Sequence, residues 1–307
     1  MKKVISCLLV SLLVVGCSTG KPTSEGITGK INVYTRDSSS GTREAFEKGV
    51  GFEKELLAEV IEVGGNGEMA AQVGADSNGI GYTSLSTDFE ANNIVALAYE
   101  GISASETSVL DGTYKLQRPF DFVTRASGDF ESDEKKQLIM AFIDYLQNSK
   151  EGLLVVKKAG GIVDTTKAKA WAELSQNHPI TSIDNSALSI VTAGSTSVSK
   201  TLQAALESFQ PLAGNFKFTM NQTGSGDGWK RVLGGEKDGP NKADIGFASR
   251  AFKSDSEDVS TALSSGTYCV DAVVAVVNAT NSEKTDYTQA QLLDIFKGTT
   301  TKWEDIK

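Results

Sequence analysis

The sequence predicts an α/β protein with two lobes, and three observations support this prediction. Segments typical of strands and segments typical of helices alternate with short loops along nearly the whole chain, which favours layered α/β packing. One arrangement, a strand followed by a loop of small residues and then a helix, occurs three times. Beyond its N-terminal apolar segment the chain keeps roughly 290 residues, enough to bury the cores of two lobes.

Residues 1–16 are expected to be a targeting segment. Two lysines precede an apolar run at residues 4–15 that is too short to anchor stably across a bilayer. The run ends in V-V-G-C, which resembles a bacterial lipobox and implies cleavage before Cys17 and lipidation of Cys17. The alternative is an ordinary secretory signal in which Cys17 is incidental. Residues 17–28 are polar and rich in Gly, Ser and Thr, as a flexible tether should be.

The first strand–loop–helix arrangement follows the tether. Residues 30–34 are β-prone and residues 44–48 favour a helix. The loop between them reads T-R-D-S-S-S-G-T-R at residues 35–43. Such a loop leaves the first backbone N–H groups of the helix unpaired. Arg36 and the hydroxyl groups add further donors, so the segment suits an oxyanion.

The middle of the chain continues the alternation of strands and helices. Short strands are expected at residues 61–63, 79–82 and 94–97, and helices at residues 137–149 and 164–174.

The second and third arrangements lie further along the chain. Their strands are expected at residues 188–192 and 216–222, and their loops are A-G-S-T-S at 193–197 and T-G-S-G-D-G at 223–228. The helices are expected over residues 198–209 and from near Trp229 onward. One such loop alone is often only a helix cap or a tight turn. Three in one chain, one of them with Arg36, favour an anion-binding protein.

The C-terminal part is expected to hold a buried strand and a short helix. Residues 269–278 form an apolar run in which Asp271 is the only charged residue, as in a central strand. Residues 288–296 form the helix, and Trp303 closes the last turn.

Charge and cysteine content limit the partners and the way the fold is held together. The net charge is −9, and loss of residues 1–16 removes two lysines and no acidic residue, which leaves about −11. This charge argues against nucleic acid or an anionic membrane surface as partner. Oriented amides and hydroxyl groups can still bind an anion at short range.

The cysteine content excludes an internal disulfide. Once Cys7 has left and Cys17 is lipidated, Cys269 remains alone, so no internal disulfide is expected.

The sequence gives little support for an enzyme. His178 is the only histidine and lies in a polar loop without a G-x-S-x-G motif or spaced metal ligands. Ser40, Ser195 and Ser225 have no base nearby in the sequence. No metal and no cofactor are therefore expected.

Taken together, the motifs resemble the phosphate-binding proteins of bacterial ABC importers, the PstS-like family. The resemblance runs from about residue 29 to residue 307. The matching segments are R-D-S-S-S-G-T at 36–42, I-G-Y-T-S-L at 80–85, D-G-T-Y-K-L-Q-R-P at 111–119, E-G-L-L-V-V-K-K-A-G at 151–160, A-G-S-T-S at 193–197, T-G-S-G at 223–226, D-I-G-F-A-S-R at 244–250, D-A-V-V-A-V-V-N at 271–278 and I-F-K-G-T-T-T-K-W at 295–303. It implies a two-lobed periplasmic-binding-protein fold of type II with a hinge.

The order of these segments differs from that of the family. In the family the A-G-S-T segment opens the mature chain, and I-F-x-G…W is soon followed by R-x-x-x-S-G-T. Here R-D-S-S-S-G-T comes first and I-F-K-G…W comes last, which indicates a circular permutation joined through roughly residues 161–187. A fragment of a tandem duplication is the alternative. Such a permutation is tolerated where the former ends lie close together.

The permuted order predicts how the lobes divide the chain. Residues 29–119 plus 279–307 would form the lobe with the R-D-S-S-S-G-T loop, and residues 120–278 would form the lobe with the other two loops. The crossings near residues 118–120 and 278–280 would act as the hinge. An anion bound by both lobes would then close the cleft.

The resemblance also implies the binding residues. Thr196, Ser197 and Ser225 should donate to the anion from one lobe. The donors of the other lobe should be Arg36, Ser40, Gly41 and Thr42. Arg36 is the candidate for a bidentate contact, and a surface pair with Asp37 is the alternative.

Selectivity for phosphate requires an acceptor, because phosphate carries a proton near neutral pH and sulfate does not. Family members commonly have an aspartate where this chain has Arg250. Asp271 is the candidate for the compensating acceptor, and Arg250 is expected to pair with Asp271 or to contact the ligand. A buried structural ion pair between the two, away from the anion, is the alternative.

The sequence therefore predicts a monomeric lipoprotein that binds inorganic phosphate outside the membrane and delivers it to an ABC permease. A receptor for sulfate, molybdate or another tetrahedral oxyanion is the first alternative. A phosphate-ester hydrolase or a sensor lipoprotein without a transport role is the second.

Overall fold

The computed structural model describes residues 27–53 and 55–307. The predicted signal segment (1–16), the predicted lipidation site Cys17 and residues 17–26 of the predicted tether lie outside the described residues. Within the described ranges, no helix is both long enough and apolar enough to cross a membrane.

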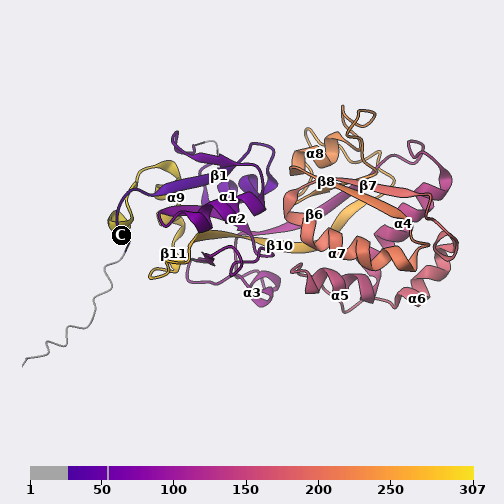
Figure 1. Ribbon diagram of the computed structural model, residues 1–307, viewed down its shortest axis with the longest axis horizontal. Coiled ribbons are helices and arrows are strands. Elements are labelled where there is room, and N and C mark those ends of the chain that lie inside the picture. The colour runs from indigo at the N-terminus through magenta and orange to yellow at the C-terminus, as the bar shows by residue number, and fades with distance from the viewer. Residues whose placement is uncertain (1–26, 54) are drawn as a thin grey trace, which may run out of the picture.

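Two halves make up the molecule, and two long strands run between them (Figure 1). These strands, β6 (Gln117–Thr124) and β10 (Ser265–Asn278), pair antiparallel. In the described chain they belong to a nine-stranded mixed sheet with the order β2-β1-β3-β10-β6-β9-β7-β8, in which β4 also pairs with β10. Residues 272–277 of β10 pack in the core of one half, whereas Tyr268 and Cys269 pack in the core of the other.

The first half contains the elements that precede β6 and those that follow β10. They are β1 (Asn32–Arg36), α1 (Gly41–Val50), β2 (Ile61–Val63), α2 (Asn66–Ala75), β3 (Gly79–Ser84), β4 (Ile94–Ala96), β5 (Ala98–Tyr99), α3 (Glu106–Leu110), β11 (Asp286–Tyr287), α9 (Gln289–Lys297) and the 3₁₀ turn η5 (Trp303–Asp305).

Aromatic packing holds α1 in place in the first half. The ring of Phe46 on α1 stacks on that of Tyr82 on β3, with 4.3 Å between centroids, and meets Phe296 of α9 edge to face at 4.9 Å. Each such pair contributes about 0.5–1.5 kcal/mol beyond its area burial. Ser40 caps the start of α1, and Gly51 ends it with φ 95°, a left-handed conformation that favours glycine. Packing and capping thus fix the direction in which the N-terminus of α1 points.

The second half contains the elements between β6 and β10. They are α4 (Asp133–Asn148), α5 (Lys150–Lys158), α6 (Trp171–Leu174), η1 (Ser175–Asn177), η2 (Pro179–Ser182), β7 (Ser189–Gly194), η3 (Thr196–Val198), α7 (Ser199–Phe209), η4 (Gln210–Leu212), β8 (Lys217–Gln222), α8 (Ser225–Lys230) and β9 (Ile245–Ala248). α7 buries Leu202, Ala205, Leu206 and Phe209, the helical spacing of one apolar face. This face packs on α4 and α5. β7 pairs with β8 on one side and β9 on the other, and this pairing fixes the start of the loop that follows it.

The predicted α/β alternation is confirmed, with local errors at three helices. The helix expected over 137–149 begins earlier, at Asp133, and ends at Asn148. The predicted helix over 164–174 is wrong, because only Trp171–Leu174 is helical. The Lys169 backbone instead bonds to Asn148 O and accepts from Lys150 N, so this segment pairs with the junction of α4 and α5 and not with itself. The helix expected from Trp229 begins earlier, at Ser225.

The two ends of the described fold lie side by side. The backbone N–H of Trp303 donates to Gly29 O at 3.1 Å, and the N–H of Ile31 donates to Thr301 O at 2.9 Å. The backbone N–H of Gly29 also donates to the Glu304 carboxylate at 2.7 Å. The C-terminal segment therefore forms part of the same packed edge as the start of β1.

Candidate anion-binding site

The three predicted loops all open helices. Ser40 caps α1, where its hydroxyl oxygen accepts from Arg43 N at 3.3 Å. Ser195 caps η3 in the same way and accepts from Ser197 N at 3.1 Å. The third loop opens α8 at Ser225 without a side-chain cap. Each loop therefore presents early backbone N–H groups, which favour a negative charge at the helix start.

Hydrogen bonds across the two halves bring these loops together. Thr42 of α1 and Ser197 of η3 join their hydroxyl oxygens at 2.8 Å. Asn66, the first residue of α2, donates from Nδ2 to Ser197 Oγ at 2.9 Å. Arg36 donates from Nη1 to Thr196 Oγ1 at 3.3 Å. Residues that lie about 130 to 160 positions apart in the sequence thus meet at one place.

A group of buried serines lies next to these contacts. Ser195 Oγ donates to Ser249 Oγ at 2.9 Å, and the oxygens of Ser225 and Ser249 lie 3.2 Å apart. Gly41 packs directly against this group, because a Cβ atom there would overlap Ser225 and lie 2.9 Å from Ser249 Oγ. All these serines are buried. The structure therefore brings together Gly41, Thr42, Thr196, Ser197 and Ser225, with Ser40 capping the adjacent helix.

Arg36 is the charged group of this cluster and is only 1% exposed. Its Nη1 donates to Asn66 Oδ1 at 2.8 Å and its Nη2 to Gly64 O at 3.0 Å. Among the described residues, nothing accepts a hydrogen bond from its Nε. Asp37 lies 3.5 Å from Nη2. Because the Arg36 side chain is buried, this contact is not the surface ion pair considered as the alternative. Burial lowers the pKa of Arg36, and the nearby Arg118 lowers it further. A buried guanidinium with a free donor is a strong attractor for an anion.

Arg118 is a second arginine at the site, and the sequence analysis did not assign it a binding role. It lies on β6 opposite Asp271 of β10, and its Nε and Nη2 donate to Asp271 Oδ2 at 3.0 and 2.8 Å. Its other contacts reach the cluster, with Nη1 3.1 Å from Ser249 Oγ and Nη2 3.0 Å from Ser197 Oγ. The available signal was its position in the K-L-Q-R-P segment, at the crossing between the halves.

Asp271 is fully enclosed behind Arg118. Its second oxygen, Oδ1, accepts from Ser84 Oγ at 2.9 Å. Burial raises the pKa of Asp271, although the Arg118 charge and hydrogen bonds act in the opposite direction. Burial likewise lowers the pKa of Arg118. We take the pair to be ionised, because three hydrogen bonds satisfy the carboxylate. Its partner is Arg118, so the predicted pairing of Asp271 with Arg250 is wrong.

Arg250 lies at the rim of the cluster. Its Nη1 and Nη2 contact the Glu257 carboxylate at 2.6 and 2.8 Å, and its Nε lies 3.0 Å from Glu44. Burial lowers the pKa of Arg250, but Glu257 and Glu44 outweigh burial and raise it. The charged partners of Arg250 are therefore Glu257 and Glu44, and not Asp271.

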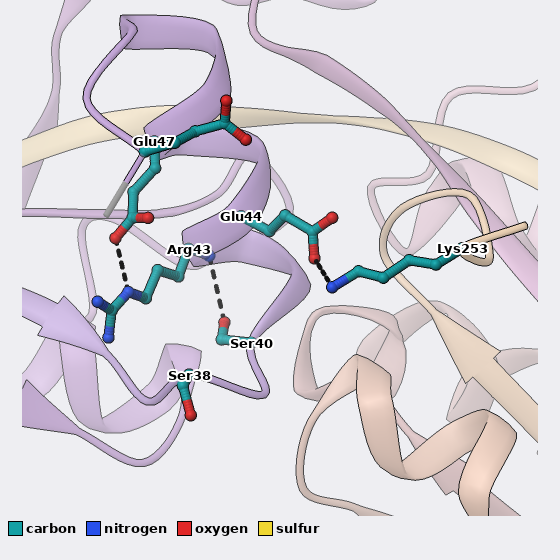
Figure 2. A pocket seen from close by; sticks show the side chains of 7 residues that line it. Ser38, Ser40, Arg43, Glu44, Glu47 and Lys253 are labelled. Carbon is teal, nitrogen blue, oxygen red and sulfur yellow. Dashed lines mark hydrogen bonds and ion pairs between the residues drawn. The ribbon is translucent and has the colours of Figure 1, made fainter. Parts of the chain in front are cut away.

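Figure 2 shows a cavity at the same rim, lined by Ser38, Ser40, Arg43, Glu44, Glu47, Glu53 and Lys253. Its volume is about 290 Å³. Three carboxylates line it, which disfavours an anion there. Apart from Ser40, the residues of the buried hydroxyl and arginine cluster, which is the candidate site, do not line this cavity. Within residues 27–53 and 55–307, no group of three or more His, Cys, Asp or Glu side chains is placed to hold a metal ion.

Comparison with known proteins agrees with this geometry. Residues 169–307 match the model of the PBP superfamily domain. A solved structure, the phosphate-binding protein of a phosphate ABC transporter from Streptococcus pneumoniae TIGR4, superposes with a TM-score of 0.64 and 27% identity over 91% of this chain and 100% of that one. Fold and site therefore define a solute-binding protein of the periplasmic-binding-protein class.

Sequence relatives narrow this class. Phosphate-binding protein PstS 2 of Streptococcus agalactiae is 30% identical over 319 residues, which cover 99% of this chain and 98% of the relative. Phosphate-binding protein PstS 2 of Streptococcus pneumoniae is 30% identical over an alignment that covers 100% of this chain and 99% of the relative. The chain belongs to the PstS-like family of phosphate-binding proteins, as its motifs predicted.

Proposed function

We propose that this protein captures inorganic phosphate between its two halves and delivers it to an ABC importer. Its relatives are named as phosphate-binding proteins, and none of these names describes an enzyme. One observation carries the proposal: donors from both halves converge around Arg36, whose Nε lacks an acceptor among the described residues.

The charges in the cluster support an anion as the ligand. Arg36 and Arg118 bring two buried positive charges, and Asp271 is the carboxylate that neutralises one of them. Hydroxyl groups of Thr42, Ser197 and other members can reorient to donate to an incoming oxygen. An anion would therefore replace hydroxyl–hydroxyl contacts with charge-assisted hydrogen bonds, which are worth more.

We propose that Arg36, Thr42, Thr196, Ser197 and Ser225 contact the anion. Backbone N–H groups at the starts of α1, η3 and α8, including that of Gly41, add to these contacts. Ser40 contributes as the cap of α1, because its own backbone N–H donates to Asp37 O at 3.1 Å.

Arg118, bonded to Ser197 and Ser249, is the addition to this set that we propose. Asp271 remains the candidate that favours a protonated anion, and its contact with Arg118 offers a route for this influence. Arg250 points to the rim, so we assign it no direct contact.

We further propose that the two halves move as lobes about β6 and β10. The predicted division gives residues 29–119 plus 279–307 to one lobe and 120–278 to the other, but residues 272–277 of β10 pack in the core of the first, so we place that crossing within β10, between Cys269 and Ala272. Separate apolar cores on either side of the site support it. Closure on the anion would then signal occupancy to the permease.

The location and chain order are proposals of the same kind. The V-V-G-C motif supports lipid anchoring at Cys17 outside the membrane, with a monomer as the working form. The PBP superfamily match begins at residue 169, before the A-G-S-T-S strand, and continues to residue 307. The contact of Trp303 with Gly29 places the C-terminal segment beside the start of β1. Both observations fit a permuted order, which the PstS 2 relatives, aligned with this chain over nearly their whole length, would share.

Calorimetry tests the ligand. The purified protein is titrated with phosphate, arsenate and sulfate at one pH and salt concentration. Tight binding of phosphate and arsenate with much weaker binding of sulfate supports the proposal. Preference for sulfate or molybdate would favour the alternative oxyanion receptor. Turnover of a chromogenic phosphate ester that survives removal of bound metal would instead support a hydrolase.

A further inference from the structure

We infer that Glu44, Arg250 and Lys253 form an ion clasp between the two halves that slows the release of bound phosphate. The inference rests on the proposed function but concerns residues outside the anion-binding cluster. The three residues act as positioning residues, since they hold the halves together and leave the contacts with the anion to others.

The clasp joins the halves at the rim of the site. Glu44 lies in the first turn of α1, in the first half. Its Oε2 lies 2.9 Å from Lys253 Nζ and 3.0 Å from Arg250 Nε, the latter an ionic contact without hydrogen-bond geometry. Both cations belong to the segment that follows β9 in the second half. Figure 2 shows the Lys253 side chain reaching from this segment to Glu44.

The cationic side of the clasp is preorganised within the second half. Glu257 accepts two hydrogen bonds from the Arg250 guanidinium, at 2.6 and 2.8 Å, and one from the backbone N–H of Lys253 at 2.9 Å. Arg250 and Glu257 are both buried. Glu257 thus fixes both cations and balances one charge, which leaves one positive charge for Glu44. Arg250 occupies the position where the family commonly has an aspartate, and the clasp assigns a role to the arginine at that position.

The clasp is close enough to the site to report on closure. Glu44 follows Gly41 and Thr42 in the same helix, and these two residues contact Ser225, Ser249 and Ser197 of the other half. Any separation of α1 from the second half breaks the clasp and the site contacts together. Stabilising the closed form raises the barrier to release, whereas the encounter with phosphate occurs in the open form.

The exposure of the clasp sets its strength. The side chains of Glu44 and Lys253 are 38% and 44% exposed, so their attraction is partly screened by water. Added salt screens it further, since the Debye length falls from about 10 Å at 0.1 M to about 3 Å at 1 M. The contribution of the clasp should therefore shrink at high ionic strength more than that of the buried cluster, although Arg250 itself is buried.

Glu44→Gln tests the clasp. The direction of the change in the phosphate release rate distinguishes a clasp from a negative charge that only repels the anion. If Glu44 acted only as a negative charge near an anion, its removal would tighten binding and slow release. As a clasp, its removal speeds release by about 2- to 5-fold at low salt, on the scale of one partly exposed ionic contact. The control Glu55→Gln removes the same charge from the same half, where Glu55 pairs with Lys297, and should leave release unchanged.

The measurement is the rate at which radiolabelled inorganic phosphate leaves the full chain, purified in detergent, after dilution into excess unlabelled phosphate. We expect the Glu44→Gln effect to shrink to less than about 2-fold near 1 M NaCl. Lys253→Gln should also speed release. In the double variant, the increase in release rate should be smaller than the product of the two single increases, because both variants break the same contact.

Release from Glu44→Gln that is unchanged or slower at low salt, with thermal unfolding like that of the unmodified protein, overturns the clasp. So does an effect that persists undiminished at high salt. Absence of phosphate binding by the unmodified protein would instead reject the proposed function, so the two failures are distinguishable.

Discussion

Replacement of Arg36 by lysine tests the geometry of the site most sharply. The substitution keeps a positive charge but removes the planar fork of the guanidinium. In the structure Nη1 and Nη2 are held by Asn66 Oδ1 and Gly64 O. The donors left for an anion are the unpartnered Nε and the Nη1 proton that now makes a long contact with Thr196.

The magnitude follows from these donors. A bidentate contact offers two charge-assisted hydrogen bonds, each worth about 1.5–3 kcal/mol. Lysine retains one of the two, so Arg36→Lys should cost about 1.5–3 kcal/mol, or roughly 10- to 100-fold in the dissociation constant. Arg36→Met loses both bonds and the charge, and should weaken binding by roughly a further 10-fold or more.

Calorimetric titration with phosphate measures the change, and thermal unfolding checks that the variant is folded. Arg125→Lys is a matched control, because Arg125 is also buried but donates to carbonyl oxygens of Asp129, Lys237 and Ala243 away from the cluster. The control should bind phosphate like the unmodified protein. Binding by Arg36→Lys within about 3-fold of the unmodified protein, at unchanged stability, would refute a bidentate role for Arg36.

Three further predictions follow from named contacts. Gly41→Ala should stabilise helix α1 by up to about 1 kcal/mol. It should nevertheless weaken phosphate binding at least about 10-fold, because the new Cβ meets Ser225 and Ser249. A phosphate affinity equal to that of the unmodified protein in calorimetry would contradict this. Asp271→Asn should lower the free energy of unfolding by about 3–5 kcal/mol, because it breaks a buried pair, and should weaken phosphate more than sulfate; equal loss for both anions would exclude Asp271 from proton recognition. Burial raises the pKa of Tyr82 to about 12, so the folded state keeps this proton while the unfolded chain loses it from about pH 10. Unfolding should therefore become easier as pH rises from about 10 to 12, by up to about 3 kcal/mol, and Tyr82→Phe should flatten this loss in denaturant titrations at several pH values.

Local sequence patterns carried much of the fold and of the candidate site. The alternation of strand-like and helix-like segments reflects burial on one face, which short windows of sequence record directly. The loops at 35–43, 193–197 and 223–228 were recognisable because small residues with hydroxyl groups open helices in a characteristic way. Their meeting in space was an expectation from the family resemblance, and the contact of Thr42 with Ser197 realises it.

Long-range partners were the part that local sequence could not supply. Arg118 and Asp271 lie 153 positions apart, and only the register of β6 on β10 sets them opposite each other. Without that register, Arg250 was proposed as partner of Asp271 or as a ligand contact because it stands where the family commonly has an aspartate, whereas Asp271 pairs with Arg118 and Arg250 with Glu257. The helix prediction for residues 164–169 is wrong for a related reason. Backbone hydrogen bonds to the junction of α4 and α5 override the helix propensity of this segment.

A crystal structure of the protein grown with phosphate tests the central claim most directly. We predict one phosphate with oxygens within hydrogen-bond distance of Arg36 and Thr42 from the first half and of Ser197 and Ser225 from the second. A phosphate held by residues of one half alone, or seated in the acidic cavity of Figure 2, would contradict the account.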